Sequence, residues 1–308
     1  MLRLLAKLAL LALLTCGVLL LLNPALDAGA VDPFYRRFTT APAGALILGS
    51  SRAAQGLQPR VLDSLLRPAG RWAGPLRNFA FTVAHSPYGP GYLRQISKKV
   101  RPGTRNGLFL LAVDPWSVSV EEQERASGEL READAFMGRL NVVWGAPNPE
   151  YLLRFGNRPL YEAYFAERGP TYLHADGWLE VRVGLDSAEV QARLEAKLRD
   201  YERLQCISTL SDERVQSLRE TIQLLQRHGT VYLLRLPVSA PMRALEQRRW
   251  PGFDALVQQL AAEHGVAYLN YHADTSYATT DGNHLTPAAG GRLSRRVACD
   301  VAGVAARK

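Results

Sequence analysis

The sequence is poor in cysteine and has no metal-binding or nucleotide-binding signature. Only three of its 308 residues are cysteine, and no CxxC pair occurs. No group of His, Asp and Glu has the spacing of metal ligands, and no glycine-rich phosphate loop is present. The sequence therefore predicts neither a metal nor a nucleotide cofactor.

Motifs of nucleic-acid recognition are missing as well. The formal net charge is +8, so a nucleic-acid partner has to be considered. The arginines, however, are scattered over the whole length, and no helix-turn-helix, zinc-finger or RNP-type pattern is present. We therefore expect no nucleic-acid partner, and the positive charge better suits anionic lipid head groups or an acidic envelope polymer.

The first thirty residues have the pattern of an export signal. Arg3 and Lys7 precede an aliphatic run over residues 8–22, which stops at Asn23-Pro24. Counted with the apolar residues just before it, the run approaches the roughly 20 residues that a helix needs to cross a membrane. The basic residues ahead of it predict that the N-terminus stays in the cytoplasm and that the rest of the chain is translocated.

Two fates remain open for this leader, residues 1–30. It is either kept as a membrane anchor, with the domain 31–308 outside the cytoplasm, or cleaved after Ala30 in the small-residue pattern Ala28-Gly29-Ala30, which releases a secreted domain. We favour the anchor. A buried core helix of a cytosolic protein fits less well, because the segment has no polar face.

Outside the leader only two cysteines remain, Cys206 and Cys299. An oxidising compartment would permit a disulfide between them, and the sequence leaves open whether they pair. Two thiols so far apart, with no CxxC motif, do not indicate a metal site.

Short strands alternate with helices along the rest of the chain. Strands are predicted at five apolar runs: 45–49, 76–81, 108–113, 230–236 and 266–270. Helices are predicted over 59–66, 88–100, 187–205, 212–228, 253–264 and 287–301. This alternation favours a parallel sheet with helices on both faces, and right-handed crossovers make a flavodoxin-like three-layer α/β/α sandwich the economical topology.

Residues 116–186 do not follow this alternation of strands and helices, and they are rich in Gly, Pro, Trp and Tyr. We interpret them as an insertion of loops and short helices over one end of the sheet, where they form a substrate-facing cap. The helix that follows, 187–205, is expected to return the chain to the sheet through its apolar stripe.

The turn after the first predicted strand reads Gly49-Ser50-Ser51-Arg52. A serine in this turn is held at the carboxyl edge of the sheet, close to backbone amides that begin the next helix and can stabilise an oxyanion. Taken alone, however, the turn favours a helix-capping serine over a nucleophile.

A second motif, Asp281-Gly282-Asn283-His284, lies just ahead of the last predicted helix. Asp and His three residues apart in one tight loop can present a carboxylate to one imidazole nitrogen while the other nitrogen faces a serine. Alone, this loop fits a surface turn equally well. Together with Ser51 it predicts a catalytic triad of Ser51, His284 and Asp281.

These two blocks resemble the SGNH/GDSL hydrolase superfamily, in which the nucleophile stands in Gly-x-Ser after the first strand and Asp-x-x-His precedes the final helix. The resemblance covers residues 44–302, and only its two end blocks are specific. It implies esterase or acyl-transfer chemistry on a flavodoxin-like sandwich. The Gly-Ser-Ser-Arg turn, the leader and Val-Asp-Pro-Trp at 113–116 are most similar to a membrane-anchored branch. That branch includes the D-alanine transfer protein of teichoic acid decoration and the polysaccharide O-acetylation proteins, whose substrates are envelope polymers.

The middle blocks depart from the pattern of the superfamily, which draws a glycine amide and an asparagine side chain from them for the oxyanion hole. The corresponding stretches here are 78–82 and 111–115, and the usual Gly-x-Asn-Asp asparagine is missing. The candidate donors are then the backbone amides of Ser51 and of a residue near Thr82, together with the side chain of Asn78. Losing one such donor typically costs about 3 kcal/mol of transition-state stabilisation.

Two charged residues beside these blocks are candidates for substrate binding. Arg52 directly follows the predicted nucleophile and can hold an anionic group of the substrate, or else pair with a nearby carboxylate. Asp114, at the end of the strand 108–113, is the second candidate.

The sequence thus predicts a serine-dependent esterase or O-acyltransferase that acts on an acylated envelope carbohydrate or polymer outside the cytoplasmic membrane. Water as the final acceptor makes it an esterase, and a sugar hydroxyl makes it a transferase; the sequence does not choose between the two. The alternative is a catalytically inactive protein of the same fold that binds an envelope polymer or scaffolds an envelope assembly. The missing asparagine keeps that alternative open.

Overall fold

The five predicted strands form one parallel sheet. The computed structural model describes residues 1–27, 32–155 and 169–306. Its central strands are β1 (Ala45–Leu48), β2 (Leu76–Asn78), β3 (Gly107–Ala112), β8 (Gly229–Arg235) and β9 (Ala267–Asn270). They lie in the order β2-β1-β3-β8-β9, and every neighbouring pair is parallel. Counted along the chain this is the order 2-1-3-4-5 of flavodoxin-like folds, so the predicted fold class is confirmed.

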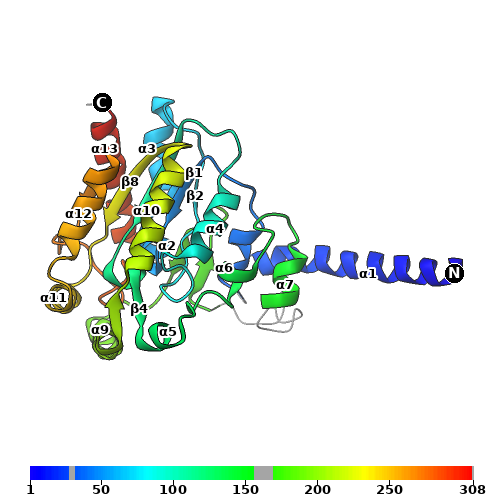
Figure 1. Ribbon diagram of the computed structural model, residues 1–308, viewed down its shortest axis with the longest axis horizontal. Helices are drawn as coiled ribbons and strands as arrows, with labels where there is room; N and C mark the ends of the chain where they lie inside the picture. The colour runs from blue at the N-terminus through cyan, green and yellow to red at the C-terminus, as the bar shows by residue number, and fades with distance from the viewer. Residues whose placement is uncertain (28–31, 156–168, 307–308) are drawn as a thin grey trace.

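Helices cover both faces of the sheet (Figure 1). Alternate residues of the strands face two apolar cores, one on each side of the sheet. One core is shared with the helices α4 (Pro90–Lys99), α10 (Asp212–Gln226) and α12 (Phe253–His264). The other is shared with the helices α2 (Ser51–Gly56), α3 (Pro59–Leu66) and α13 (Pro287–Ala306). Strands β1 and β3 are buried at every position and are apolar throughout, so they were recognisable in the sequence.

Helix α9 (Ser187–Ile207) forms where it was predicted. None of its residues is fully buried, but its half-buried side chains Leu198, Tyr201 and Leu204 pack against the core on one face of the sheet. The helix also lies beside the loop that precedes α13, where Tyr201 contacts Asn283 and Lys197 contacts Asp281.

The interval 116–186 contains short helices, as predicted, and also strands that the sequence did not indicate. Its described elements are η3 (Pro115–Val118), β4 (Ser119–Glu121), α5 (Glu122–Ser127), α6 (Phe136–Arg139), α7 (Pro149–Phe155), β5 (Thr171–Leu173) and β6 (Leu179–Val181). β5 and β6 form an antiparallel hairpin, and β4 pairs with β7 (Ser208–Leu210) beyond α9. Residues 156–168 lie outside the described residues, and the substrate-facing cap stays a prediction.

Further elements of the described residues were not predicted. They include the 3-10 helices η1 (Tyr35–Phe38) and η2 (Arg67–Ala69) and the helix α11 (Ala240–Arg249). Helix α11 has little apolar periodicity, because Met242 and Leu245 are its only buried apolar side chains. The segment was therefore not recognisable by hydrophobic pattern.

The N-terminal helix α1 (Leu2–Asp27) projects away from the sandwich (Figure 1). In the described part of the chain it is the one helix long and apolar enough to cross a membrane, with a mean hydropathy of 2.5. The helix continues through Pro24 instead of stopping there. Its last turns are tied to the domain by hydrogen bonds of 2.9 Å from Tyr35 to Asn23 and from Thr39 to Asp27. Its length and composition fit both a membrane anchor and a signal peptide.

The two cysteines of the domain do not form a disulfide. Cys206 and Cys299 are both free and exposed. The pairing that the sequence left open is absent from the structure.

Candidate active site

Ser51 is the first residue of α2 and directly follows the turn that leaves β1. Gly49 makes this turn with φ +133°, and a Cβ at this position would lie 2.7 Å from the carbonyl oxygen of Ala112 in β3. Only glycine satisfies both the positive φ and the close approach. The turn therefore brings Ser51 to the carboxyl edge of the sheet, at the point between β1 and β3 where the strand order reverses.

The loop before α13 is folded around the carboxylate of Asp281. Its Oδ1 accepts the backbone N–H groups of Asn283 at 2.9 Å and of His284 at 2.8 Å. Gly282 makes the turn with φ +82°. The loop therefore fixes the Asp281 carboxylate beside the imidazole of His284.

These two segments meet in the structure, although 233 positions separate Ser51 from His284. His284 Nδ1 lies 2.7 Å from Asp281 Oδ2, and His284 Nε2 lies 2.8 Å from Ser51 Oγ. A carboxylate only accepts hydrogen bonds, so Nδ1 carries the imidazole proton and Nε2 is the acceptor for the Ser51 hydroxyl. The arrangement has the geometry of a Ser-His-Asp triad.

The carboxylate of Asp281 stays ionised in this setting. Burial alone would raise the pKa of Asp281, but the hydrogen bond and charge of His284, with the two backbone N–H groups, hold it well below its usual range. An ionised Asp281 keeps the imidazole in the tautomer that can accept a proton from Ser51.

The candidate oxyanion donors differ in their availability. Both hydrogens of the Asn78 side-chain amide are used, because Nδ2 donates to the carbonyl oxygens of Ala53 and Leu57 at 2.9 and 3.1 Å. The prediction that Asn78 donates to an oxyanion is therefore wrong, and this side chain instead holds helix α2 against β2.

The two backbone N–H groups predicted as oxyanion donors, those of Ser51 and Thr82, lie beside the turn at Gly49. Phe81 donates its N–H to the carbonyl oxygen of Gly49 at 3.2 Å, which holds the following residue, Thr82, beside the turn of Ser51. Neither the N–H of Ser51 nor that of Thr82 has an acceptor among the described residues. Thr82 also bonds His85 Nδ1 through its hydroxyl, at 2.6 Å, so His85 faces this segment and not the triad.

Arg52 and Asp114, the two predicted substrate-binding residues, are both buried at 4% exposure. Arg52 pairs with Glu246 at 2.5 Å. Asp114 accepts hydrogen bonds from the hydroxyl of Ser50 at 2.8 Å and from the backbone N–H of Ser117 at 2.9 Å. The prediction that they hold substrate groups is wrong, because both side chains are buried and bonded to the protein itself. Of their side-chain polar atoms, only Arg52 Nη1 has no hydrogen-bond partner among the described residues.

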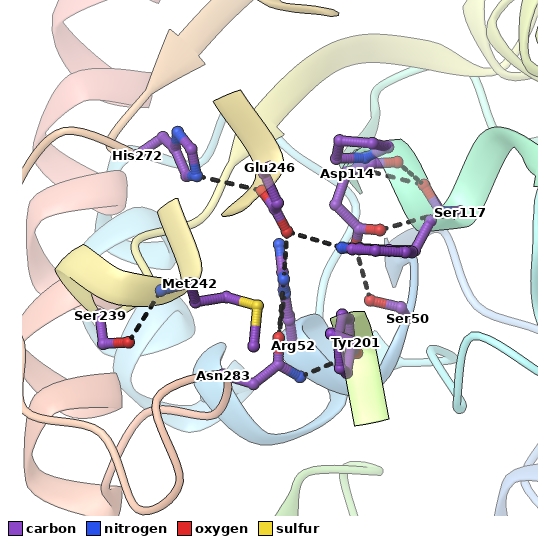
Figure 2. A network of polar contacts seen from close by, with 12 residues as sticks. Ser50, Arg52, Asp114, Ser117, Tyr201, Ser239, Met242, Glu246, His272 and Asn283 are labelled. Atoms are coloured by element: carbon purple, nitrogen blue, oxygen red, sulfur yellow. Dashed lines mark hydrogen bonds and ion pairs between the residues drawn. The ribbon is translucent and has the colours of Figure 1, made fainter. Parts of the chain in front are cut away.

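The residues that sequence reasoning missed surround Glu246, and Figure 2 shows Arg52 and His272 directed at its carboxylate. Glu246 of α11 is buried among four donors: Arg52, Arg235, Trp116 and His272. Burial alone would raise the pKa of Glu246, but the charges of Arg52 and Arg235 hold it well below its usual range. No sequence signal indicated this carboxylate, because α11 itself was not predicted.

The fold and the site together define a class: a three-layer α/β/α protein with a Ser-His-Asp triad at the carboxyl edge of its parallel sheet. In the described residues, no group of three or more His, Cys, Asp and Glu side chains is placed to hold a metal ion.

The sequence matches no model of a known protein family and no curated protein. Among the solved structures that are similar to this chain, three each match 84% of it. A lipase/acylhydrolase from Enterococcus faecalis is 13% identical, with a TM-score of 0.40 over 95% of its own chain. A carbohydrate acetylesterase from Sinorhizobium meliloti is 9% identical, with a TM-score of 0.39 over 98%. An aryl esterase from M. smegmatis is 10% identical, with a TM-score of 0.37 over 98%. At such low identities and scores, the activities of these enzymes do not carry over to this chain.

Proposed function

We propose that the protein is a serine-dependent esterase or O-acyltransferase of the SGNH type. The observation that carries the proposal is the hydrogen-bonded series from Ser51 Oγ to His284 Nε2, at 2.8 Å, and from His284 Nδ1 to Asp281 Oδ2, at 2.7 Å. A serine hydroxyl is a weak nucleophile at neutral pH, and an adjacent base in this geometry activates it.

In the first half of the reaction, Ser51 Oγ attacks the ester carbonyl carbon while its proton passes to His284 Nε2. The tetrahedral intermediate collapses when the bond to the leaving oxygen breaks, and His284 returns the proton to that oxygen. Asp281 holds the imidazole and stabilises its charged form throughout. The product of this half is an acyl group on Ser51 and a free alcohol.

In the second half, water or a sugar hydroxyl attacks the acyl group, and His284 takes its proton and then gives it back to Ser51. Water makes the protein an esterase, and a sugar hydroxyl makes it a transferase. The free N–H groups of Ser51 and Thr82 are the donors that we propose for the oxyanion in both halves.

The proposed substrate is an acylated carbohydrate or polymer of the cell envelope. The support for it is the apolar helix α1 at the N-terminus, together with the excess of positive charge. If α1 anchors the chain with its N-terminus in the cytoplasm, the triad faces the compartment where such polymers are found. The resemblance to the membrane-anchored SGNH branch points to the same class of substrate.

The second candidate is a non-catalytic protein of the same fold that binds an envelope polymer. The hydrogen bonds from the Asn78 side chain to the carbonyl oxygens of Ala53 and Leu57 favour this second candidate, because they leave the site with no identified side-chain donor for an oxyanion.

The test is ester hydrolysis by the full chain in detergent micelles, with p-nitrophenyl acetate as the substrate. Ser51→Ala should abolish the activity, and Ser64→Ala, at an exposed serine of α3, should leave it unchanged. Equal activity in the Ser51→Ala variant and the native chain would rule out Ser51 as the nucleophile. If neither turns over, labelling of Ser51 by a fluorophosphonate still reports an activated hydroxyl, and the absence of labelling favours the binding protein.

A further inference from the structure

Asn283 stands between Arg52 and His284 with its side-chain orientation fixed. Its Oδ1 lies 2.9 Å from Arg52 Nε and 2.7 Å from Arg52 Nη2. A guanidinium group has only donors, so the atom that faces it must be the amide oxygen. The amide nitrogen of Asn283 is therefore turned away from Arg52.

That nitrogen faces the reacting side of the imidazole. Asn283 Nδ2 lies 3.3 Å from His284 Nε2 and 3.3 Å from the hydroxyl of Tyr201. The Ser51 hydroxyl already donates to the lone pair of Nε2 at 2.8 Å, so the amide N–H at 3.3 Å is a second, weaker donor to the same nitrogen. Protonation of Nε2 would set two N–H groups against each other, so this contact favours the neutral imidazole that can accept a proton from Ser51.

Arg52 is held in turn by Glu246, as Figure 2 shows. The exposed fractions of the Arg52 and Glu246 side chains are 4% and 1%. Trp116 Nε1 donates to the same Glu246 oxygen as Arg52, at 2.7 Å, while Arg235 pairs with the other one at 2.6 Å. Glu246 thus offsets part of the arginine charge near His284 and fixes the guanidinium that orients Asn283.

The charged and titratable groups around His284 come from several elements. They are Asp281 on its own loop, Arg52 on α2, Arg193, Lys197 and Tyr201 on α9, Glu246 on α11, Arg235 on β8, His272 after β9 and Asp114 after β3. Of these, Asp281 meets Nδ1, whereas Arg52 and Tyr201 act on the Asn283 amide that meets Nε2.

We propose that Asn283 is a positioning residue that keeps His284 neutral and directed at Ser51, and that Arg52 and Glu246 act through it. This inference rests on the proposed function and adds the residues that prepare the base of the same site. None of the three touches the substrate in this role.

The first test is Asn283→Asp, with the titration of His284 followed by NMR of the ¹⁵N-labelled histidine rings in the full chain in micelles. The change replaces the N–H donor beside Nε2 by a carboxylate oxygen that attracts a proton. The titration midpoint of His284 should rise by about one pH unit. Asn283→Ala removes the donor and adds no charge, so it should raise the midpoint by less, and it serves if the aspartate variant does not fold.

The matched control is Asn106→Asp, the same chemical change at an exposed residue just before β3, at the opposite edge of the sheet. It should leave the midpoint of His284 where it is in the native chain.

A second variant, Glu246→Gln, removes the charge that offsets Arg52 and Arg235. It should move the midpoint in the opposite direction, to lower pH, because the net positive charge near the imidazole increases.

The rise of the midpoint in Asn283→Ala is the signature of the proposal, because that change removes the N–H donor and adds no charge, whereas Asn283→Asp and Glu246→Gln also act through their charge. An unchanged or lowered midpoint in Asn283→Ala would overturn it. In the ester assay, Asn283→Ala should lower kcat about tenfold and leave KM unchanged. If Ser51→Ala retains full activity, the proposed function fails, but the NMR titration still decides the role of Asn283.

Discussion

Ser50 Oγ donates a 2.8 Å hydrogen bond to Asp114 Oδ2 and so links the loops that follow β1 and β3. Both side chains are buried, and the nucleophile turn is thereby fastened to the neighbouring strand. We predict that Ser50→Ala lowers the free energy of unfolding by about 1–3 kcal/mol, because a buried carboxylate oxygen loses its partner. Urea unfolding of the variant and the native chain measures this difference.

A matched serine is available for comparison. Ser97 on α4 is exposed, and its hydroxyl bonds only the carbonyl oxygen of Arg94 one turn earlier. Ser97→Ala should change the free energy of unfolding by less than about 0.5 kcal/mol. An equal loss in the two variants would mean that the bond from Ser50 to Asp114 does not stabilise the turn.

Replacing Asp281 by asparagine tests how the carboxylate acts on the histidine. The amide that takes the place of the carboxylate would no longer select the tautomer with its proton on Nδ1, so Nε2 would lose its role as acceptor for Ser51. We expect kcat of ester hydrolysis to fall by roughly 10³–10⁴-fold with the fold intact. Steady-state kinetics and circular dichroism together check this, and a loss of less than tenfold would argue against the triad.

The pH dependence of stability follows from the same carboxylate. The pKa of Asp281 is lower in the folded chain than the value of 3.8 expected when it is unfolded. Its ionised form therefore adds stability that is fully present above about pH 4 and is lost as the pH falls below that value. The native chain should therefore have a larger free energy of unfolding than Asp281→Asn, and the difference between the two should be larger at pH 6 than at pH 3. Denaturant titrations at both pH values measure it, and an advantage independent of pH contradicts the assignment.

The fate of helix α1 can be decided by the N-terminus of the mature protein. An anchor keeps residues 1–30 and leaves the chain in the membrane fraction after an alkaline carbonate wash. A cleaved signal peptide gives a soluble chain that begins at Val31. We expect the anchor, and N-terminal mass spectrometry of the purified protein distinguishes the two.

Much of the sheet could be predicted because its middle strands β1 and β3 are buried on both faces. Residues 45–48 and 107–112 are buried at every position, which leaves short apolar runs that end in glycine or Asp-Pro. Helix α11 carries too few apolar residues to be seen in this way, and Glu246, the acceptor of two arginines, was missed with it.

The sequence by itself determined the parallel α/β fold and the candidacy of Ser51, Asp281 and His284, because apolar runs and short loop motifs are local features of the chain. Only the tertiary structure decided that Arg52, Asp114 and Asn78 are engaged with the protein itself and that Asn283 faces the imidazole. The contacts of Asn78 with Leu57, Asp114 with Ser50 and Arg52 with Asn283 join residues 21, 64 and 231 positions apart. The partner of a buried polar group depends on how the strands and helices pack, and no local pattern encodes that packing.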